Sequence, residues 1–512
     1  MLSIKEECEL CGKNYLPKQP VVPPAGAFPE PVLSEHPLLA FRCTPMIQPY
    51  LEEDTPRKAG IIIDAIITYQ HVQDAVPIAL PFDSEPLHVV ISLDGEEVAH
   101  MDILPNSTNV EVIFPLAGHT PQYVPYTIGC TATRHAPGTS QNEHFYTTSS
   151  LRYIPDSILG SVTKIDHRTG MLLTKSATGK FEPIFPIGFY TSFGNYLDRN
   201  LSILDELKAQ GFNTVHPVPP FHDLQVFTNI LDRMEKLGLY LMYDMRHTYQ
   251  DPQQRTREIE LMKNYPNLLL WYTADEPDGP THSLDATVTA YDAIYALDGY
   301  HPVSIALNCA DHYFTEYAAG ADIVIPDVYM VGNDVKYSSQ YDTVCTADYG
   351  CCGCDNCQGE LDDVARRLDV FKDRLRILGW DRQKALWSIT QAFGGEEFWS
   401  RAPTGREWLV QALISINHGA RGITPWIDPT PLDIKHTASL LARSLPSIVR
   451  FLADPYISFI HSSSHRVDIG MWSASSETLV VATNGDAVAQ RYPLLMRGSK
   501  RGGVCDGWRR EG

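Results

Sequence analysis

Two features are scarce in this sequence of 512 residues, and each excludes a class of protein. No apolar run reaches the ~18–20 residues that cross a bilayer, so we do not expect an integral membrane protein. Cations are few, because 41 Lys and Arg stand against 62 Asp and Glu and the net charge is −21. Such a surface repels nucleic acid and anionic lipid, so we expect neither as a partner. It is compatible with a neutral substrate such as a sugar.

The start of the chain also lacks the apolar core of a secretory signal. The eleven cysteines indicate the opposite, because five of them lie between Cys345 and Cys357. Outside the cell this cluster predicts a loop held by disulfides, whereas in the cytosol it would suit a metal. We favour disulfides, since no histidine completes a zinc set nearby, and we interpret Cys8 and Cys11 as two ordinary thiols. We therefore expect an extracellular or secretory protein, and we expect one or both ends not to be those of the mature form.

The sequence pattern divides the chain into four parts. Residues 1–58 are rich in proline, and we expect them to be irregular. Residues 59–182 contain short strands separated by Pro, Gly, Asn and Asp, which predicts a β-sandwich accessory domain. Residues 183–453 alternate short apolar runs with amphipathic stretches, several of which end in glycine. Residues 454–512 predict a short C-terminal β appendage that is cut off early.

The alternating region predicts a (β/α)8 TIM barrel, which makes the fold class α/β. Eight apolar runs, each followed by a helical pattern, fit the ~250 residues of a typical barrel. An open doubly wound sheet is the alternative. That fold has a Gly-rich phosphate turn after its first strand, and the turn here, TSFGNYLD, contains no G-x-G-x-x-G.

In such a barrel the functional residues follow the carboxyl ends of the strands. The residues there are mostly acids and aromatics, with no serine elbow, no His-x-x-x-His pair and no lysine for a Schiff base. We therefore predict no metal and no cofactor, and we infer no protein partner. The candidates for catalysis are Glu276, Asp275, Asp327 and Asp244. The candidates for substrate binding are Tyr190, His216, Arg246, Tyr329, Gln391, Glu396, Trp426 and Asp428.

The most informative motif is the run Leu268–Pro277, LLLWYTADEP. Two adjacent acids, Asp275 and Glu276, end a strand that is too apolar to lie on the surface. Burial beside Trp271 and Tyr272, together with the neighbouring charge, should raise the pKa of a carboxyl group there. A general acid for a glycosidic oxygen needs such a pKa. A helix N-cap cluster is the alternative, because an Asp shortly before Pro277 and an Asp-Gly pair also suit caps and turns.

This motif, with FPIGFYTS, YDMR and GITPW at strands 1, 3 and 8, resembles (β/α)8 glycoside hydrolases. More narrowly it resembles fungal proteins with a glycoside hydrolase catalytic core, related to the large retaining clan. The resemblance covers about residues 184–450 and implies that Glu276 is the acid/base. The residue before it is usually Asn in that clan and is Asp275 here. The clan's nucleophile is usually a Glu that ends strand 7, where this chain has Gln391.

A second catalytic group could come from three sources. Glu396 or its neighbour could fold back from the strand-7 loop, or Asp244 or Asp327 could act as base or nucleophile. The substrate's own 2-acetamido group could instead attack, with Asp275 orienting the amide. We predict a glycosidase that cleaves a neutral or 2-acetamido sugar from an oligo- or polysaccharide, with Glu276 as the proton donor. The alternatives are a barrel that binds carbohydrate without cleaving it and a hydrolase or lyase of another bond.

The binding residues also leave alternatives open. Arg246 could hold a uronate carboxylate, or it could only neutralise Asp244. Trp426 is the best candidate for stacking on a sugar face. The cysteine-rich loop, which follows strand 6, could form a rim over the site or be only a stapled insertion.

Overall fold

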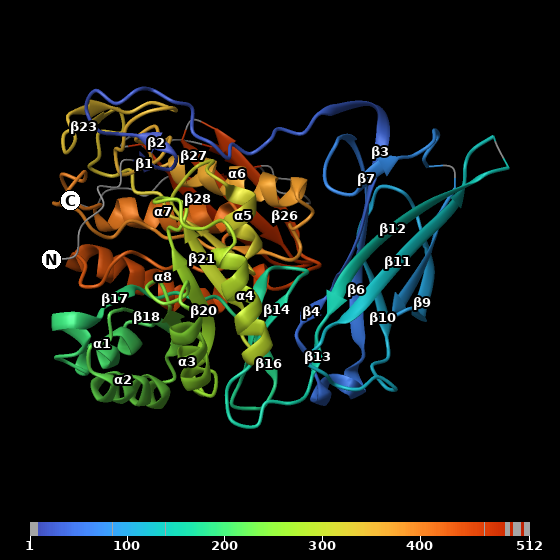
Figure 1. Cartoon of the computed structure of the whole chain (residues 1–512), viewed down its shortest axis with the longest axis horizontal. Coiled ribbons are helices and arrows are strands. Elements are labelled where there is room, and N and C mark those ends of the chain that lie inside the picture. Colours follow the sequence, from blue (N-terminus) through green and yellow to red (C-terminus); the bar gives the residue numbers. More distant parts are fainter. Residues whose placement is uncertain are drawn as a thin grey trace.

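The computed structural model describes residues 9–83, 85–138, 140–464 and 466–486, together with the backbone of 492–494 and 503–505. Figure 1 shows a β-rich part, in blue to teal at the right, beside a mixed α/β part in green to red at the left. The first described residues, in dark blue, lie along the mixed part before the chain enters the β-rich part.

The β-rich part consists of two four-stranded antiparallel sheets, with the orders β10-β6-β3-β7 and β12-β11-β8-β9. Their strands are β3 (Leu33–Pro45), β6 (Ala59–Gln70), β7 (Ala75–Pro77), β8 (Leu87–Leu93), β9 (Glu96–Ile103), β10 (Ser107–Phe114), β11 (Tyr126–His135) and β12 (Asn142–Leu151). Alternate residues such as Val89 and Ile91 are buried in a core shared by both sheets. A disulfide between Cys43 and Cys130 joins the two sheets. This is the arrangement of a β-sandwich.

Strand β3 begins inside the proline-rich stretch that we expected to be irregular. Its pairing with β6 shifts register between Leu33 and Leu38, and it ends at Pro45. The prolines therefore occupy the shifted part and the last position, where a missing backbone N–H is tolerated. The stretch between them is buried within the sheet, so the sandwich includes residues on the N-terminal side of 59.

Short elements connect the two parts and bind the loops together. The connecting sheet has the order β16-β15-β14-β4, and β5 pairs with β13 in parallel. The bounds are β1 (Glu9–Leu10), β2 (Lys13–Asn14), β4 (Ile47–Gln48), β5 (Tyr50–Leu51), η1 (Glu52–Arg57), β13 (Tyr153–Ile154), β14 (Thr163–Asp166), β15 (Met171–Lys175), β16 (Phe181–Ile184), β23 (Tyr337–Ser338), β24 (Thr343–Val344), β29 (Tyr492–Leu494) and β30 (Gly503–Cys505).

The mixed part contains a parallel sheet with the order β17-β18-β19-β20-β21-β22-β25. Its strands are β17 (Tyr190–Ser192), β18 (Thr214–Val218), β19 (Tyr240–Asp244), β20 (Leu268–Asp275), β21 (Val303–Leu307), β22 (Ile323–Pro326) and β25 (Ala385–Leu386). The helices between and after them are η2 (Phe193–Leu197), α1 (Ser202–Ala209), α2 (Leu224–Leu237), α3 (Pro252–Met262), α4 (Ala286–Leu297), α5 (Phe314–Ala319), α6 (Asp363–Ile377), α7 (Gly405–Asn417) and α8 (Leu432–Leu452). The mixed α/β class is therefore confirmed.

The segment between α7 and α8 adds parallel bridges at both ends of this strand order. The bridges join Ile423 to Ser388 and to Ile187, Trp426 to Gln391, and Asp428 to Thr191. Backbone hydrogen bonds accompany them, from Asp428 N to Tyr190 O at 2.7 Å and from Ala392 N to Trp426 O at 2.7 Å. The segment thus lies between the seventh strand and the first.

Local sequence explains these elements. The side chain of Asp223 caps α2 by accepting hydrogen bonds from two backbone N–H groups, and Gly238 ends the helix in the left-handed conformation, with φ 63°. In β20 the run Leu268–Ala274 is buried throughout. A parallel strand covered on both faces needs such a continuous apolar run.

A three-stranded antiparallel sheet follows α8, with strands β26 (Ser458–Ser464), β27 (Val467–Ser473) and β28 (Thr478–Asn484). It is the described part of the predicted β appendage, and most of the remaining stretch to residue 512 lies outside the described residues. Within the described part of the chain, none of the helices combines the length and apolar composition needed to cross a bilayer.

Candidate active site

The candidate site lies where the parallel strands end. Strand β20 delivers Asp275 opposite Ala306 of β21, and the chain then turns at Glu276, whose φ is 49°. A non-glycine residue in this left-handed region costs about 1 kcal/mol or more. The backbone N–H of Glu276 still donates to the Ala306 carbonyl at 3.2 Å. The turn therefore fixes the place of the Glu276 side chain, which is half-buried.

An ionic network occupies one side of the site. The guanidinium of Arg246 donates from Nε to Asp244 Oδ2 at 2.8 Å and from one terminal nitrogen to Asp275 Oδ2 at 2.5 Å. His216 Nε2 lies 2.8 Å from the same oxygen of Asp244. Although burial opposes ionisation, Arg246 and His216 hold the pKa of Asp244 below its usual value. Arg246 thus connects the carboxyl groups of Asp244 and Asp275.

Asp275 differs from Asp244 in its protonation. Burial is the largest influence on Asp275, and it outweighs the attraction of Arg246 and raises the pKa to about 7. The charge of the neighbouring Glu276 acts in the same direction. The Tyr272 hydroxyl donates to Asp275. Asp275 is therefore a carboxyl group with a fixed position that changes its charge near neutral pH.

Aromatic rings line the network. The Tyr190 hydroxyl donates to the Tyr272 hydroxyl at 3.0 Å, and the Tyr190 ring lies 4.0 Å from the His216 ring, centroid to centroid. The half-buried Trp426 ring is 5.0 Å from Tyr190 and 5.3 Å from the guanidinium carbon of Arg246. Burial lowers the pKa of His216, so its neutral ring donates to Asp244. Together with the ionic network, these contacts bring together six of the predicted positions, namely Tyr190, His216, Arg246, Trp426, Asp244 and Asp275.

A second cluster surrounds Glu276. Asn308 Nδ2 donates to Glu276 Oε2 at 3.1 Å. The carboxyl group of Asp327 lies close enough to Glu276 for the two to influence each other's protonation. Burial and the nearby charge of Glu276 raise the pKa of Asp327 well above its usual value. The raised pKa favours the uncharged form of Asp327 beside Glu276. Tyr329 belongs to the same cluster, because burial raises its pKa well above the usual value and the nearby Asp327 and Glu276 act in the same direction.

Asp278 holds the loop next to this cluster in place, although the Asp-Gly pair that it begins predicts only a turn or a helix cap. Its two carboxylate oxygens accept the backbone N–H groups of Asn308 at 3.2 Å and Cys309 at 2.8 Å. This anchors the loop that carries the Asn308 amide. Burial raises the pKa of Asp278 to about 7. The signal available in the sequence was a third acid, two residues after Glu276.

Three predicted residues have other partners. The Gln391 side chain is fully buried, and its amide bonds to the backbone N–H and carbonyl of Val331 at 2.8 and 2.9 Å. Asp428 is also fully buried and pairs with Lys435 Nζ at 2.9 Å. Glu396 is exposed and lies in a turn with Trp399. Their contacts stabilise the loops around the site rather than joining the two clusters.

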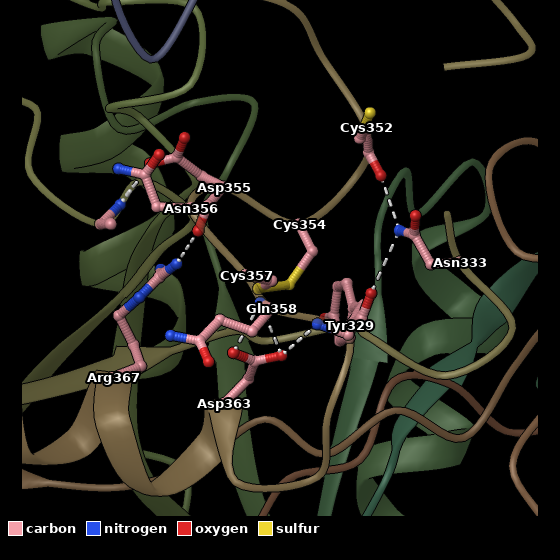
Figure 2. Close-up of a disulfide and its surroundings, with 12 residues drawn as sticks. Tyr329, Asn333, Cys352, Cys354, Asp355, Asn356, Cys357, Gln358, Asp363 and Arg367 are labelled. Atoms are coloured by element: carbon pink, nitrogen blue, oxygen red, sulfur yellow. Dashed lines mark hydrogen bonds between the residues drawn. A yellow bond between two sulfur atoms is a disulfide. The ribbon is translucent and has the colours of Figure 1, made fainter. Parts of the chain in front are cut away.

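The cysteine-rich loop lies beside the Tyr329 end of the site (Figure 2). Disulfides join Cys345 to Cys352 and Cys354 to Cys357, which confirms the disulfide interpretation. The side chain of Asn333 donates to the Cys352 carbonyl at 2.6 Å and to the Tyr329 carbonyl at 3.4 Å, so it connects the loop to the segment after β22.

The interpretation of Cys11 as an ordinary thiol is wrong, because it forms a disulfide with Cys309, the residue after Asn308. Cys8 lies outside the described residues. Lys13 Nζ donates to Asp355 and so binds the N-terminal segment to the cysteine-rich loop. The two segments enclose a cavity of about 390 Å³ that Asn308 also lines. The four disulfides among the described cysteines are compatible with an extracellular protein.

Comparisons with known proteins give structural neighbours only. No family model and no curated protein matches the sequence. The chain is similar to an FMN-binding beta-glucuronidase from Facaelibacterium prausnitzii L2-6, at 11% identity and a TM-score of 0.37 over 89% of this chain and 75% of that one. It is also similar to a glycoside hydrolase, at 14% identity and a TM-score of 0.40 over 61% of this chain and 83% of that one. An alpha-amylase from Anoxybacillus is similar at 11% identity and a TM-score of 0.40, over 63% of this chain and 93% of that one. TM-scores and sequence identities of this size are too low to assign a function.

Proposed function

We propose that this chain is a glycoside hydrolase in which Glu276 donates a proton to the glycosidic oxygen. The observation that carries the proposal is the pair of neighbouring carboxyl groups, Glu276 and Asp327, at the end of buried parallel strands. Two neighbouring carboxyl groups do not both ionise readily, so they can share one proton. A retained proton on a half-buried acid is what general acid catalysis requires.

The proposal includes a closed (β/α)8 barrel. The bridges from Ile423, Trp426 and Asp428 to both end strands support closure, with the segment 422–428 as the eighth strand. In a closed barrel the ends of β17 to β25 and of this segment surround one mouth, which is where barrel enzymes bind substrate. The proposed domain division keeps the barrel at 183–453 and extends the sandwich back to β3.

The residues around Glu276 have distinct roles in this mechanism. Asp327 shares a proton with Glu276, and Asn308 holds one oxygen of Glu276, which leaves the carboxyl group poised toward the leaving oxygen. When Glu276 gives this proton to the leaving oxygen, the hydrogen bond from the Asn308 amide stabilises the carboxylate that forms. The same carboxylate then accepts a proton from the attacking water in a later step.

The group that attacks the anomeric carbon is the 2-acetamido group of the substrate, and Asp275 orients it. Asp327 acts on the protonation of Glu276, which makes it a partner for the proton rather than a separate nucleophile. Asp244 is fully buried and holds Arg246. Asp275 keeps a side chain that is 24% exposed and fixed by Arg246 and Tyr272. It can accept the amide N–H of an acetamido group and orient that group to attack the anomeric carbon.

Hydrolysis of a panel of aryl and alkyl glycosides, with and without a 2-acetamido group, tests the proposal. Glu276→Gln should lower kcat/KM by about 10²–10⁴-fold, most on alkyl leaving groups, which need protonation. Asp275→Asn should lower activity on acetamido substrates selectively. The exposed Glu206→Gln on α1 is the matched control and should act as wild type.

The outcomes separate the alternatives. If wild type binds sugars and hydrolyses none of them, the chain is a carbohydrate-binding barrel. If Glu276→Gln is as active as wild type on alkyl glycosides, Glu276 is not the acid. If neutral sugars are cleaved and Asp275→Asn affects them equally, the substrate does not assist.

A further inference from the structure

A group of two histidines and one aspartate lies away from the proposed active site, where the C-terminal sheet meets α7 (Figure 1). His418 follows the last residue of α7, His461 is on β26 and Asp468 is on β27. Asp468 pairs with Ser463, two residues from His461 along β26, so His461 and Asp468 lie on the same face of the sheet. That face is turned to the end of α7.

The three side chains converge on one point. His418 Nε2 lies 3.0 Å from Asp468 Oδ2, and His461 Nε2 lies 2.7 Å from that same oxygen. All three donor atoms are within 4.8 Å of one another. Ligand atoms of a tetrahedral zinc site, with bonds of ~2.0–2.1 Å, lie about 3.3 Å apart. Small side-chain movements would therefore bring these atoms to ligand positions around one ion.

The surrounding residues hold the donors in the orientation that a metal requires. Asp369 Oδ1 lies 2.8 Å from His418 Nδ1, which directs the other ring nitrogen, Nε2, toward Asp468. Asn417 Nδ2 donates to Asp468 Oδ1 at 2.5 Å, which leaves Oδ2 facing the two imidazoles. A carboxylate behind a ligating histidine is the usual support of a zinc ligand, because it fixes the tautomer and makes the ring a better donor.

We propose that His418, His461 and Asp468 bind one zinc ion, with water as the fourth ligand. Two imidazole nitrogens and one carboxylate oxygen are donors that zinc prefers. The two carboxylates of Asp369 and Asp468 balance the double positive charge of the ion. The His461 side chain is 28% exposed, so the ion can enter from solvent. The ligands come from α7 and from two strands of the sheet, so the ion fastens the C-terminal sheet to the rest of the chain.

Zinc titration of the full-length chain after treatment with a chelator tests the proposal, and Co²⁺ reports the geometry by its visible absorption. Wild type should bind one equivalent of Zn²⁺ with a rise in melting temperature, and bound Co²⁺ should show the intense bands of tetrahedral coordination. His461→Gln should abolish this binding. Asp369→Asn, on a half-exposed side chain that does not touch the ion, should weaken it by about 10–100-fold.

The matched control is His436→Gln, which removes another exposed histidine on α8 and should bind zinc as wild type does. The proposal is overturned if wild type binds no stoichiometric zinc, or if His461→Gln binds it as tightly as wild type. Far-UV circular dichroism of each variant shows whether it is folded. Because these residues lie outside the active site, the result is independent of whether Glu276→Gln loses activity.

Discussion

Replacing Arg246 by methionine should be among the most destabilising single substitutions in the barrel. Methionine keeps an apolar stem, but it removes a cation that contacts both Asp244 and Asp275. The Arg246 side chain is only 10% exposed and Asp244 is fully buried. Removing one partner of a buried ion pair costs about 3–5 kcal/mol, because a charge is left without compensation. We therefore expect the free energy of unfolding to fall by about 3–5 kcal/mol at pH 7.5.

The loss should depend on pH in a definite direction. Without Arg246, the pKa of Asp275 in the folded chain rises further above the unfolded value of about 4, and the pKa of Asp244, which Arg246 holds below its usual value, rises as well. An acid with a raised pKa binds more protons when folded, so its penalty is absent below pH 4 and complete above the folded pKa. The pKa of Asp275 is about 7 even in the wild type. The difference between variant and wild type should therefore shrink when the pH falls from 7.5 to 5.

Urea unfolding followed by far-UV circular dichroism at the two pH values measures both quantities. The control is Arg233→Met, which removes an ion pair with Asp205 whose side chains are about 40% exposed. An exposed pair contributes about 0–1 kcal/mol, so this variant should unfold like wild type. A loss for Arg246→Met below 1 kcal/mol, or one that is equal at pH 5 and 7.5, would refute the electrostatic argument.

Three further predictions concern the surroundings of the site. Cys309→Ser should lower the free energy of unfolding by about 2–5 kcal/mol, because it breaks the disulfide to Cys11. Cys351→Ala, at a buried free thiol, should lower it by only about 1 kcal/mol. Equal effects of the two substitutions in urea unfolding would contradict the pairing. Burial raises the pKa of Asp278 to about 7, so the cost of ionising it in the folded chain grows as the pH rises from 4 to 7. Asp278→Asn should remove this cost, and the melting temperature should then fall less between pH 4 and 7 than it does in the wild type. If the melting temperature depends on pH as in the wild type, Asp278 does not titrate in this range. Gln391→Ala should cost about 2–3 kcal/mol in urea unfolding through its lost hydrogen bonds to backbone, and a loss of activity without a loss of stability would instead favour a role in binding.

Much of the parallel sheet could be predicted from the sequence because its strands are buried on both faces. Such strands appear as continuous apolar runs, and the run Leu268–Ala274 is an example. Strand β3 was missed because Pro37 and Pro45 argue against a central strand. The structure accommodates them at a register shift and at the strand end. These local adjustments depend on the partner strand and leave no mark in the sequence of β3 itself.

The sequence located the ends of the strands but not the direction of each side chain. Gln391 follows strand 7 where a catalytic acid was expected, yet its amide is directed to the backbone at Val331. Asp428 follows the last predicted strand and is directed to Lys435, seven residues later. Both choices depend on which partner a neighbouring loop supplies. The disulfide from Cys11 to Cys309, which spans 298 residues, was equally inaccessible to spacing arguments.

The adjacency of Asp275 and Glu276 has a consequence that only the backbone reveals. Successive residues of a strand point in opposite directions, so two neighbouring acids in a regular strand would not serve the same cavity. The left-handed φ of 49° at Glu276 breaks that alternation. One carboxyl group then meets Arg246 and Tyr272, and the other meets Asn308 and Asp327. Different surroundings allow two adjacent acids to take different roles, and in the proposed mechanism one donates the proton and the other orients the substrate.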